Sequence, residues 1–146
     1  MTVTTQEEAP APKGMRWNWN RNPKCVALAR SQLRKHLARC QAEELTDSAV
    51  LLLSELLTNS VRHAQVPGRE IETVFEVTEE LLRVEVSDAS NKVPVMRHVD
   101  DDAEEGRGLS LVAMVASRWG TDPRMVNGQY AIGKTVWFEI DRKAEL

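Results

Sequence analysis

Three polar side chains in this sequence are spaced to lie on one face of a helix. Glu55, Asn59 and His63 follow one another at intervals of four residues. A helix advances about 3.6 residues per turn, so these side chains form a single stripe. A carboxylate one turn before a carboxamide can hold a metal-bound phosphate group and orient the group that attacks it. For this segment alone, a solvated face of an ordinary amphipathic helix is an equally open interpretation.

A further acidic side chain follows a predicted strand. Residues 82–86 alternate between apolar and polar types, and Asp88 comes directly after them, with Ser90 two positions later. A carboxylate just beyond a sheet edge can accept a hydrogen bond from an exocyclic amine, such as that of adenine. Asp and Ser also favour turns for local reasons, so turn chemistry is the alternative interpretation.

A pair of glycines precedes a predicted helix. Gly106 and Gly108 flank Arg107, and Leu109 begins the apolar stretch. Closely spaced glycines let backbone amides converge, and a helix N-terminus favours anions, so the segment suits a polyphosphate. A flexible hinge with a glycine cap is the alternative. A dinucleotide fingerprint is less well supported, because Leu111 stands where the third glycine belongs.

The segment from Gly128 to Thr135, GQYAIGKT, matches the phosphate-binding P-loop pattern in every letter. That mechanism needs a strand before the loop and a helix after it. The following residues, VWFEI, alternate as a strand, so we expect no P-loop here. Gly133 and Thr135 can still offer an amide and a hydroxyl to a phosphate.

Hydrophobic periodicity predicts the elements that position these residues. In the helix after the glycines, Val112, Val115 and Ala116 are expected on the apolar side. The predicted elements, in chain order, are a strand over 16–20, a helix from Pro23 to about Arg39, a helix capped by Asp47 that ends before Pro67, a hairpin over 70–86, a polar loop over 88–105, a helix over 109–117, a short strand from Trp119 and a last strand over 135–140.

This order of elements predicts an α+β fold: a two-layer α/β sandwich with a mixed, mostly antiparallel sheet and its helices on one face. We expect a disordered leader over residues 1–14 and a single domain over residues 15–146. The chain has 146 residues, of which 42% are hydrophobic, and a net charge of −3. That charge gives no argument for direct nucleic-acid or membrane binding.

The sequence also favours a cytoplasmic location. Its longest apolar runs are far shorter than a membrane span, and the N-terminus shows no signal-peptide stretch. The two cysteines, Cys25 and Cys40, have a spacing that fits neither a metal site nor a bridge within one helix, so free thiols are expected.

Taken in order, these segments resemble the GHKL ATPase superfamily, which includes gyrase and the histidine kinases. Residues 55–64, ELLTNSVRHA, resemble its N box, and Asp88 with Ser90 resembles its first glycine box. Residues 105–112, EGRGLSLV, resemble the second glycine box, and residues 133–138 resemble the closing glycine-threonine strand. Four boxes in the right order make a strong signal although each alone is weak.

The resemblance implies a histidine-kinase-like ATPase fold that binds ATP and Mg²⁺. By this resemblance Glu55 is the general base, Asn59 coordinates Mg²⁺, and Asp88 binds the adenine amine, with Ser90 as a further nucleotide contact. His63 belongs either to the nucleotide site or to helix packing. The remaining nucleotide ligands are then Gly106, Arg107, Gly108, Leu109 and Thr135.

Chain size and the form of the N box resemble the small anti-sigma-factor kinases of Gram-positive, especially actinobacterial, bacteria. The resemblance implies an anti-sigma factor that is also a serine/threonine protein kinase, with an anti-sigma-factor antagonist, a sigma factor or both as partners and a homodimer as its assembly. The chain departs from the family in its first glycine box, where Ala89 and Ser90 replace glycine-rich sequence. A non-catalytic module, in which nucleotide only tunes partner binding, is therefore the alternative.

Overall fold

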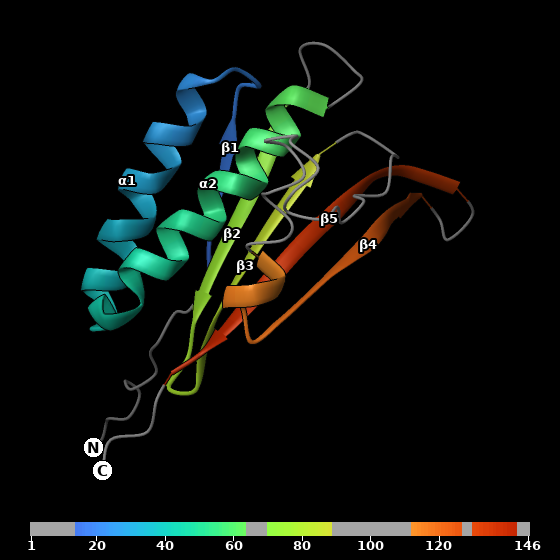
Figure 1. The fold of residues 1–146 in the computed structure, drawn as a ribbon. Coiled ribbons are helices and arrows are strands. Elements are labelled where there is room, and N and C mark those ends of the chain that lie inside the picture. Colours follow the sequence, from blue (N-terminus) through green and yellow to red (C-terminus); the bar gives the residue numbers. More distant parts are fainter. Residues whose placement is uncertain (1–13, 64–69, 89–111, 127–129, 143–146) are drawn as a thin grey trace, which may run out of the picture.

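The protein folds as two layers, a five-stranded sheet and a pair of helices that cover one of its faces (Figure 1). The computed structural model describes residues 14–63, 70–88, 112–126 and 130–142. The sheet has the order β1-β2-β3-β5-β4, and each of these four pairings is antiparallel. The predicted α+β sandwich with helices on one face is confirmed, although the sheet of the described residues is antiparallel at every pairing rather than mixed. Its elements are β1 (Gly14–Trp19), α1 (Lys24–Arg39), the short 3₁₀ helix η2 (Glu43–Leu45), α2 (Thr46–His63), β2 (Ile71–Val77), β3 (Leu81–Asp88), β4 (Arg118–Val126) and β5 (Tyr130–Asp141).

The sheet presents a continuous apolar face to the helices. Phe75 of β2 is opposite Val84 of β3, which is in turn opposite Phe138 of β5, and all three side chains are fully buried. The row continues to Trp119 of β4. Alternation along each strand directs the neighbouring polar residues to the other face, so the period-2 pattern of residues 70–86 yields the predicted hairpin.

The helices bury leucines against this apolar face of the sheet. Leu33 and Leu37 of α1 and Leu53 and Leu57 of α2 have no exposed surface. Just before α1, the side-chain oxygen of Asn22 accepts a hydrogen bond of 2.7 Å from the Lys24 amide. These contacts set the position of α2, the helix that carries the polar stripe, over β3.

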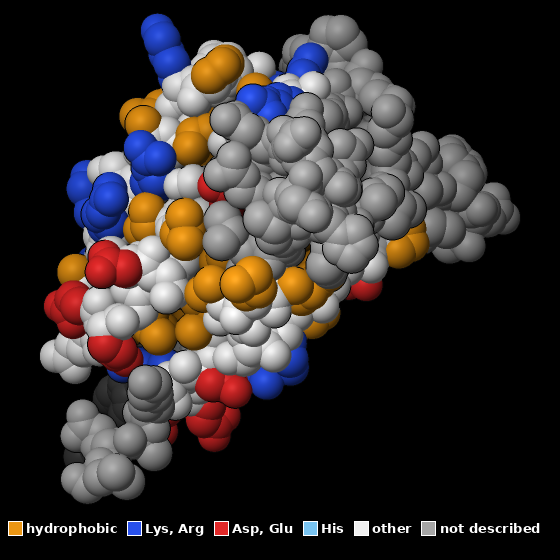
Figure 2. Space-filling model, viewed as in Figure 1, with side chains coloured by type: hydrophobic (Ala, Val, Ile, Leu, Met, Phe, Trp, Pro, Cys, Tyr) orange, Lys and Arg blue, Asp and Glu red, His pale blue; other side chains and the backbone are white. Residues whose placement is uncertain are grey.

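Two predicted details of the helices are wrong. Asp47 lies inside the first turn of α2, because the preceding η2 leads directly into a helix that begins at Thr46. Val115 was expected to face inward, but it is 36% exposed, whereas Val112 is fully buried. Residues 112–115 form a helical turn at the surface, where hydrophobic side chains gather (Figure 2) and Met114 is 73% exposed.

The strand boundaries also differ from the prediction. β1 begins and ends slightly earlier than predicted, β4 is nine residues long rather than short, and β5 begins at Tyr130 rather than at Thr135. Pro123 and the irregular register between Arg124 and Met125 interrupt the alternation of β4, and pairing with β5 extends both strands. The described part of the segment that matches the P-loop pattern, residues 130–135, therefore lies in strand β5. A P-loop would need a helix after it, so the prediction that this segment is no P-loop agrees with the structure.

Among the helices of the described residues, none is long and apolar enough to cross a membrane.

Candidate functional site

The polar stripe of α2 brings a carboxylate and a carboxamide to one face. Glu55 and Asn59 are one helical turn apart, and both side chains are half-buried. Within the part of the chain that the structure describes, neither side chain makes a hydrogen bond or an ion pair. A half-buried carboxylate and amide of this kind can accept hydrogen bonds from a bound molecule or coordinate a metal ion through their oxygens.

A buried carboxylate lies beside the same helix. Asp88 ends β3 and is only 1% exposed. One of its oxygens, Oδ2, accepts a hydrogen bond of 2.8 Å from the Ser60 hydroxyl of α2. Because Ser60 is the residue after Asn59, this bond fixes the end of β3 against the polar stripe of the helix.

A lysine neutralises this buried carboxylate. The Nζ atom of Lys134 on β5 lies 3.0 Å from Oδ1 and 3.1 Å from Oδ2 of Asp88. The two residues are directly opposite in the β3–β5 pairing, and their side chains are 12% and 2% exposed. Breaking a buried ion pair by removal of one partner is destabilising, so each residue supports the other.

Lys134 and Ser60 are functional candidates that the sequence interpretation missed. A signal for Lys134 was present, because strand alternation places it on the same face as the buried Val136 and Phe138. A lysine at an inward strand position needs a carboxylate partner. Ser60 gave a weaker signal, since serine is common in helices that contain no site.

Thr135 lies on the other face of the sheet. Its hydroxyl is 2.7 Å from that of Ser87, the residue opposite it on β3, and successive strand residues point in opposite directions. The Thr135 side chain therefore points away from the face of the sheet that carries Asp88, and its predicted role as a phosphate ligand stays a prediction. Lys134, one residue earlier, occupies the helix-facing position.

The other predicted ligands lie outside what the structure describes. His63 is the last residue of α2, but its side chain is not among the described ones. Ser90 and residues 106–109 lie outside the described residues, as do nearly all of the predicted polar loop over 88–105 and of the predicted leader.

An arginine holds the end of the helix that carries the stripe. Nη1 of Arg21, in the link between β1 and α1, donates a hydrogen bond of 3.0 Å to the Val61 carbonyl. Cations that bind the last carbonyls of a helix are favourable there. This contact fixes the last turn of α2, two residues beyond Asn59.

A comparison with protein families decides what these elements belong to. Residues 20–137 match the histidine kinase-like ATPase domain, a match that takes in both long helices and nearly all of the sheet except β1. This chain belongs to that family. No match was found among curated proteins.

Membership of the ATPase domain family makes ATP the ligand expected at this site. The side chains fit such a ligand: Asn59 offers an amide oxygen, Glu55 offers a carboxylate, and Asp88 offers a carboxylate that Ser60 and Lys134 help to hold. Within the described ranges, no cluster of three or more His, Cys, Asp or Glu could hold a metal ion.

Proposed function

We propose that this ATPase domain is a Mg-ATP-dependent serine/threonine protein kinase that also acts as an anti-sigma factor. One observation supports the proposal most directly. The Ser60 hydroxyl holds the buried Asp88 against α2, and Ser60 directly follows Asn59 in that helix. The proposed acceptor for the adenine amine, Asp88, is therefore held next to the proposed metal-binding amide of Asn59. In this assignment Asp88 binds the base, Asn59 the magnesium ion, and Glu55 is the general base.

Catalysis would depend on positioning and on charge neutralisation. Magnesium, when bound, would neutralise the charge of the phosphate groups. Asn59 contributes one oxygen ligand that orients the metal-bound phosphate. Glu55, one turn earlier on the same face, accepts the proton of the attacking serine or threonine hydroxyl. Ser90, Arg107, the flanking glycines and Leu109 complete the proposed nucleotide contacts.

The proposed substrate is an anti-sigma-factor antagonist, and the proposed binding partner is a sigma factor. Both partners come from the resemblance of the N box at residues 55–64 to small anti-sigma-factor kinases. The same resemblance supports a homodimer and a role in transcription regulation in the cytoplasm.

The first test is ATP binding by calorimetry with and without Mg²⁺. Asn59→Ala should weaken Mg-ATP binding about 10- to 100-fold, because a metal-orienting ligand is lost, while binding without metal should change little. Asn18→Ala is the matched control, since Asn18 is exposed on β1. Equal losses with and without Mg²⁺ would argue against a metal role for Asn59.

The second test separates chemistry from binding. Glu55→Gln should lower phosphoryl transfer from labelled ATP to an antagonist protein about 100- to 10,000-fold and leave ATP affinity nearly unchanged. Glu76→Gln, an exposed carboxylate of β2, is the control. Retained transfer in Glu55→Gln would reject Glu55 as the base.

The second candidate is a non-catalytic module in which nucleotide tunes the affinity for a sigma factor or antagonist. The observation that favours it is the sequence after Asp88, Ala-Ser-Asn, where the family carries glycines that let the backbone approach a ligand. ATP binding occurs under both candidates. Phosphoryl transfer to a cognate partner occurs only under the first, so the transfer assay distinguishes them.

A further inference from the structure

The lysine beside Asp88 has more hydrogen-bonding capacity than its ion pair uses. An ammonium group carries three N–H donors, and the contacts of Lys134 with the two Asp88 oxygens take at most two of them. The Lys134 side chain also keeps more exposed surface, 12%, than that of Asp88, 2%. A ligand group that reaches Asp88 therefore also meets the ammonium group of Lys134.

The pair presents an acceptor and a donor side by side, about as an amide does. An amide of asparagine or glutamine binds adenine in two places at once, because it accepts from the exocyclic amine and donates to a neighbouring ring nitrogen. On the edge of adenine that pairs with thymine, the 6-amino group is a donor and N1 beside it is an acceptor. Asp88 and Lys134, 3.0 Å apart, offer the complementary order.

We propose that Lys134 is a specificity-determining residue that, together with Asp88, hydrogen-bonds to the adenine ring and selects it over guanine. This inference rests on the proposed ATP site: Asp88 accepts a hydrogen bond from the 6-amino group, and the ammonium of Lys134 donates one to N1. Ser60 and Lys134 together hold the carboxylate in place for this contact.

The same pair disfavours guanine seated in the same way. Guanine has a carbonyl oxygen at position 6 and an N–H at position 1. The oxygen would then face the Asp88 carboxylate, and the N–H would face the Lys134 ammonium, so both positions would be mismatched. Discrimination between the two purines thus arises from two residues on neighbouring strands.

The experiment compares ATP with 1-deaza-ATP, in which a C–H group replaces N1, by calorimetry on the full chain. The wild type should bind 1-deaza-ATP about 10- to 100-fold more weakly than ATP, the loss expected for one charged hydrogen bond. GTP should bind more weakly still. In Lys134→Met the difference between ATP and 1-deaza-ATP should disappear, and in Lys134→Arg, which keeps a donor, part of it should remain.

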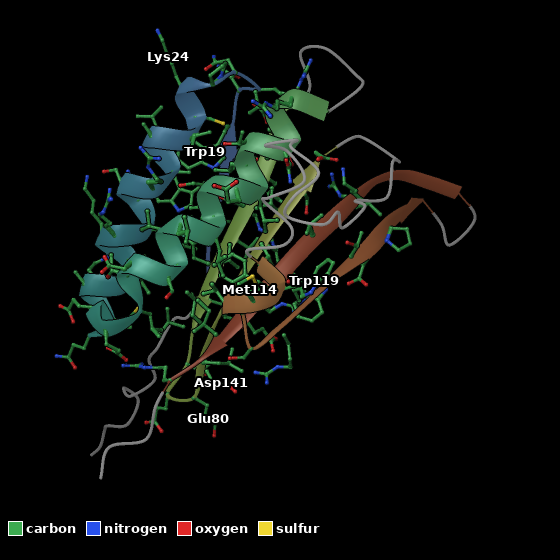
Figure 3. The ribbon with its side chains drawn as sticks, in the orientation of Figure 1. Trp19, Lys24, Glu80, Met114, Trp119 and Asp141 are labelled. Carbon is green, nitrogen blue, oxygen red and sulfur yellow. The ribbon has the colours of Figure 1, made fainter. Side chains whose placement is uncertain are left out.

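Lys24→Met is the matched control, because it removes one positive charge from an exposed lysine at the start of α1 that points away from the domain (Figure 3). It should retain the discrimination of the wild type. Since Lys134→Met removes the ammonium group from a buried ion pair, folding of this variant is checked by circular dichroism. If Lys134→Met does not fold, the inference is tested by the ratio of ATP affinity to 1-deaza-ATP affinity in the wild type and in Lys134→Arg.

Three outcomes would overturn the inference, and they differ in what else they affect. Equal binding of ATP and 1-deaza-ATP by the wild type makes Lys134 a counterion of Asp88 only and leaves the ATP site intact. The same holds for a folded Lys134→Met that still discriminates as the wild type does. Absence of ATP binding by the folded wild type overturns the ATP site itself and this inference with it.

Discussion

At the scale of single residues, burial decides the ionisation of a histidine in the core. His36 of α1 is 4% exposed, its ring lies 6.3 Å from that of Phe75, and its Nε2 lies 3.8 Å from the Cys40 sulfur. Burial lowers the pKa of the imidazole, and the positive charge of Arg39 lowers this pKa further. The folded protein therefore holds His36 neutral at a pH where the unfolded chain binds a proton.

This difference sets the direction of a pH effect on stability. The pKa of His36 is near 6.5 in the unfolded chain and lower in the folded protein, so stability should be lost as the pH falls below about 6.5. His36→Leu should reduce that loss between pH 7 and pH 5. Urea unfolding midpoints of both proteins across this range measure it. An unchanged pH slope in His36→Leu would mean that other groups are responsible.

The sequence predicted the helical part of the candidate site, Glu55 and Asn59, better than the contacts of Asp88 on the sheet. Glu55 and Asn59 could be placed together because helical spacing alone puts them on one face. The contacts of Asp88 could not be predicted, because Ser60 and Lys134 lie 28 and 46 residues from it in the sequence. Long-range pairing is a property of the whole sheet, and local periodicity carries no information about it.

At the scale of elements, the end of α1 contains a residue in an unfavourable backbone conformation. Gln41 has a φ of 57°, in the left-handed region, and its amide donates to the Ala38 carbonyl at 3.1 Å. The next amide, of Ala42, donates to Leu37 at 2.8 Å, so the chain reverses here in the usual way for a helix C-terminus. Glycine is the residue that adopts this conformation without a Cβ clash.

Gln41→Gly should therefore stabilise the protein, by about 0.5–1 kcal/mol, because relief of the left-handed strain exceeds the greater entropy of glycine in the unfolded chain. The substitution keeps the backbone carbonyl that Arg142 uses. Thermal or urea unfolding measures the change. Gln41→Ala, which retains a Cβ, is the control and should show no such gain; an equal gain in both variants would point to the glutamine side chain instead.

Elements with a clean period were predictable and those without it were not. The hairpin of β2 and β3 alternates from Ile71 to Val86 as its residue types predict, and only its end departs from the pattern, because Ser87 and Asp88 are both buried. In β4 the alternation is interrupted by Pro123 and by an irregular register between Arg124 and Met125. Because the pairing of β4 continues past this irregularity, the length of the strand could not be predicted from its own residues.

At the scale of the whole molecule, the two layers could be predicted but the strand order could not. Runs of helix followed by runs of strand favour helices on one face of a sheet, as observed. The insertion of β5 between β3 and β4 brings Lys134 opposite Asp88, and nothing in the local sequence indicates this crossover. The candidate site therefore depends on the global topology as much as on its motifs.

One arginine at the end of the last strand contacts the segment after α1 and the turn between β2 and β3. Just after β5, Arg142 donates at 2.9 Å to the Gln41 carbonyl after α1 and at 3.1 Å to the Thr78 carbonyl in the β2–β3 turn. Its Nε lies 3.0 Å from a carboxylate oxygen of Glu44. The guanidinium thus connects three segments that are distant in the sequence.

Arg142→Ala should lower the free energy of unfolding by about 1–2 kcal/mol, because two carbonyl groups lose a charged donor. Glu44→Gln should cost much less, since the Glu44 side chain is 52% exposed and exposed ion pairs contribute little. Arg34→Ala, at an exposed position of α1, controls for the loss of an arginine. Urea unfolding of the three variants measures these differences.

If Arg142 connects the helix layer to the sheet, Arg142→Ala should shift the midpoint of the whole cooperative transition. If it holds only the chain end, hydrogen exchange should rise near residue 142 while the midpoint stays with that of Arg34→Ala, and that result would contradict the prediction.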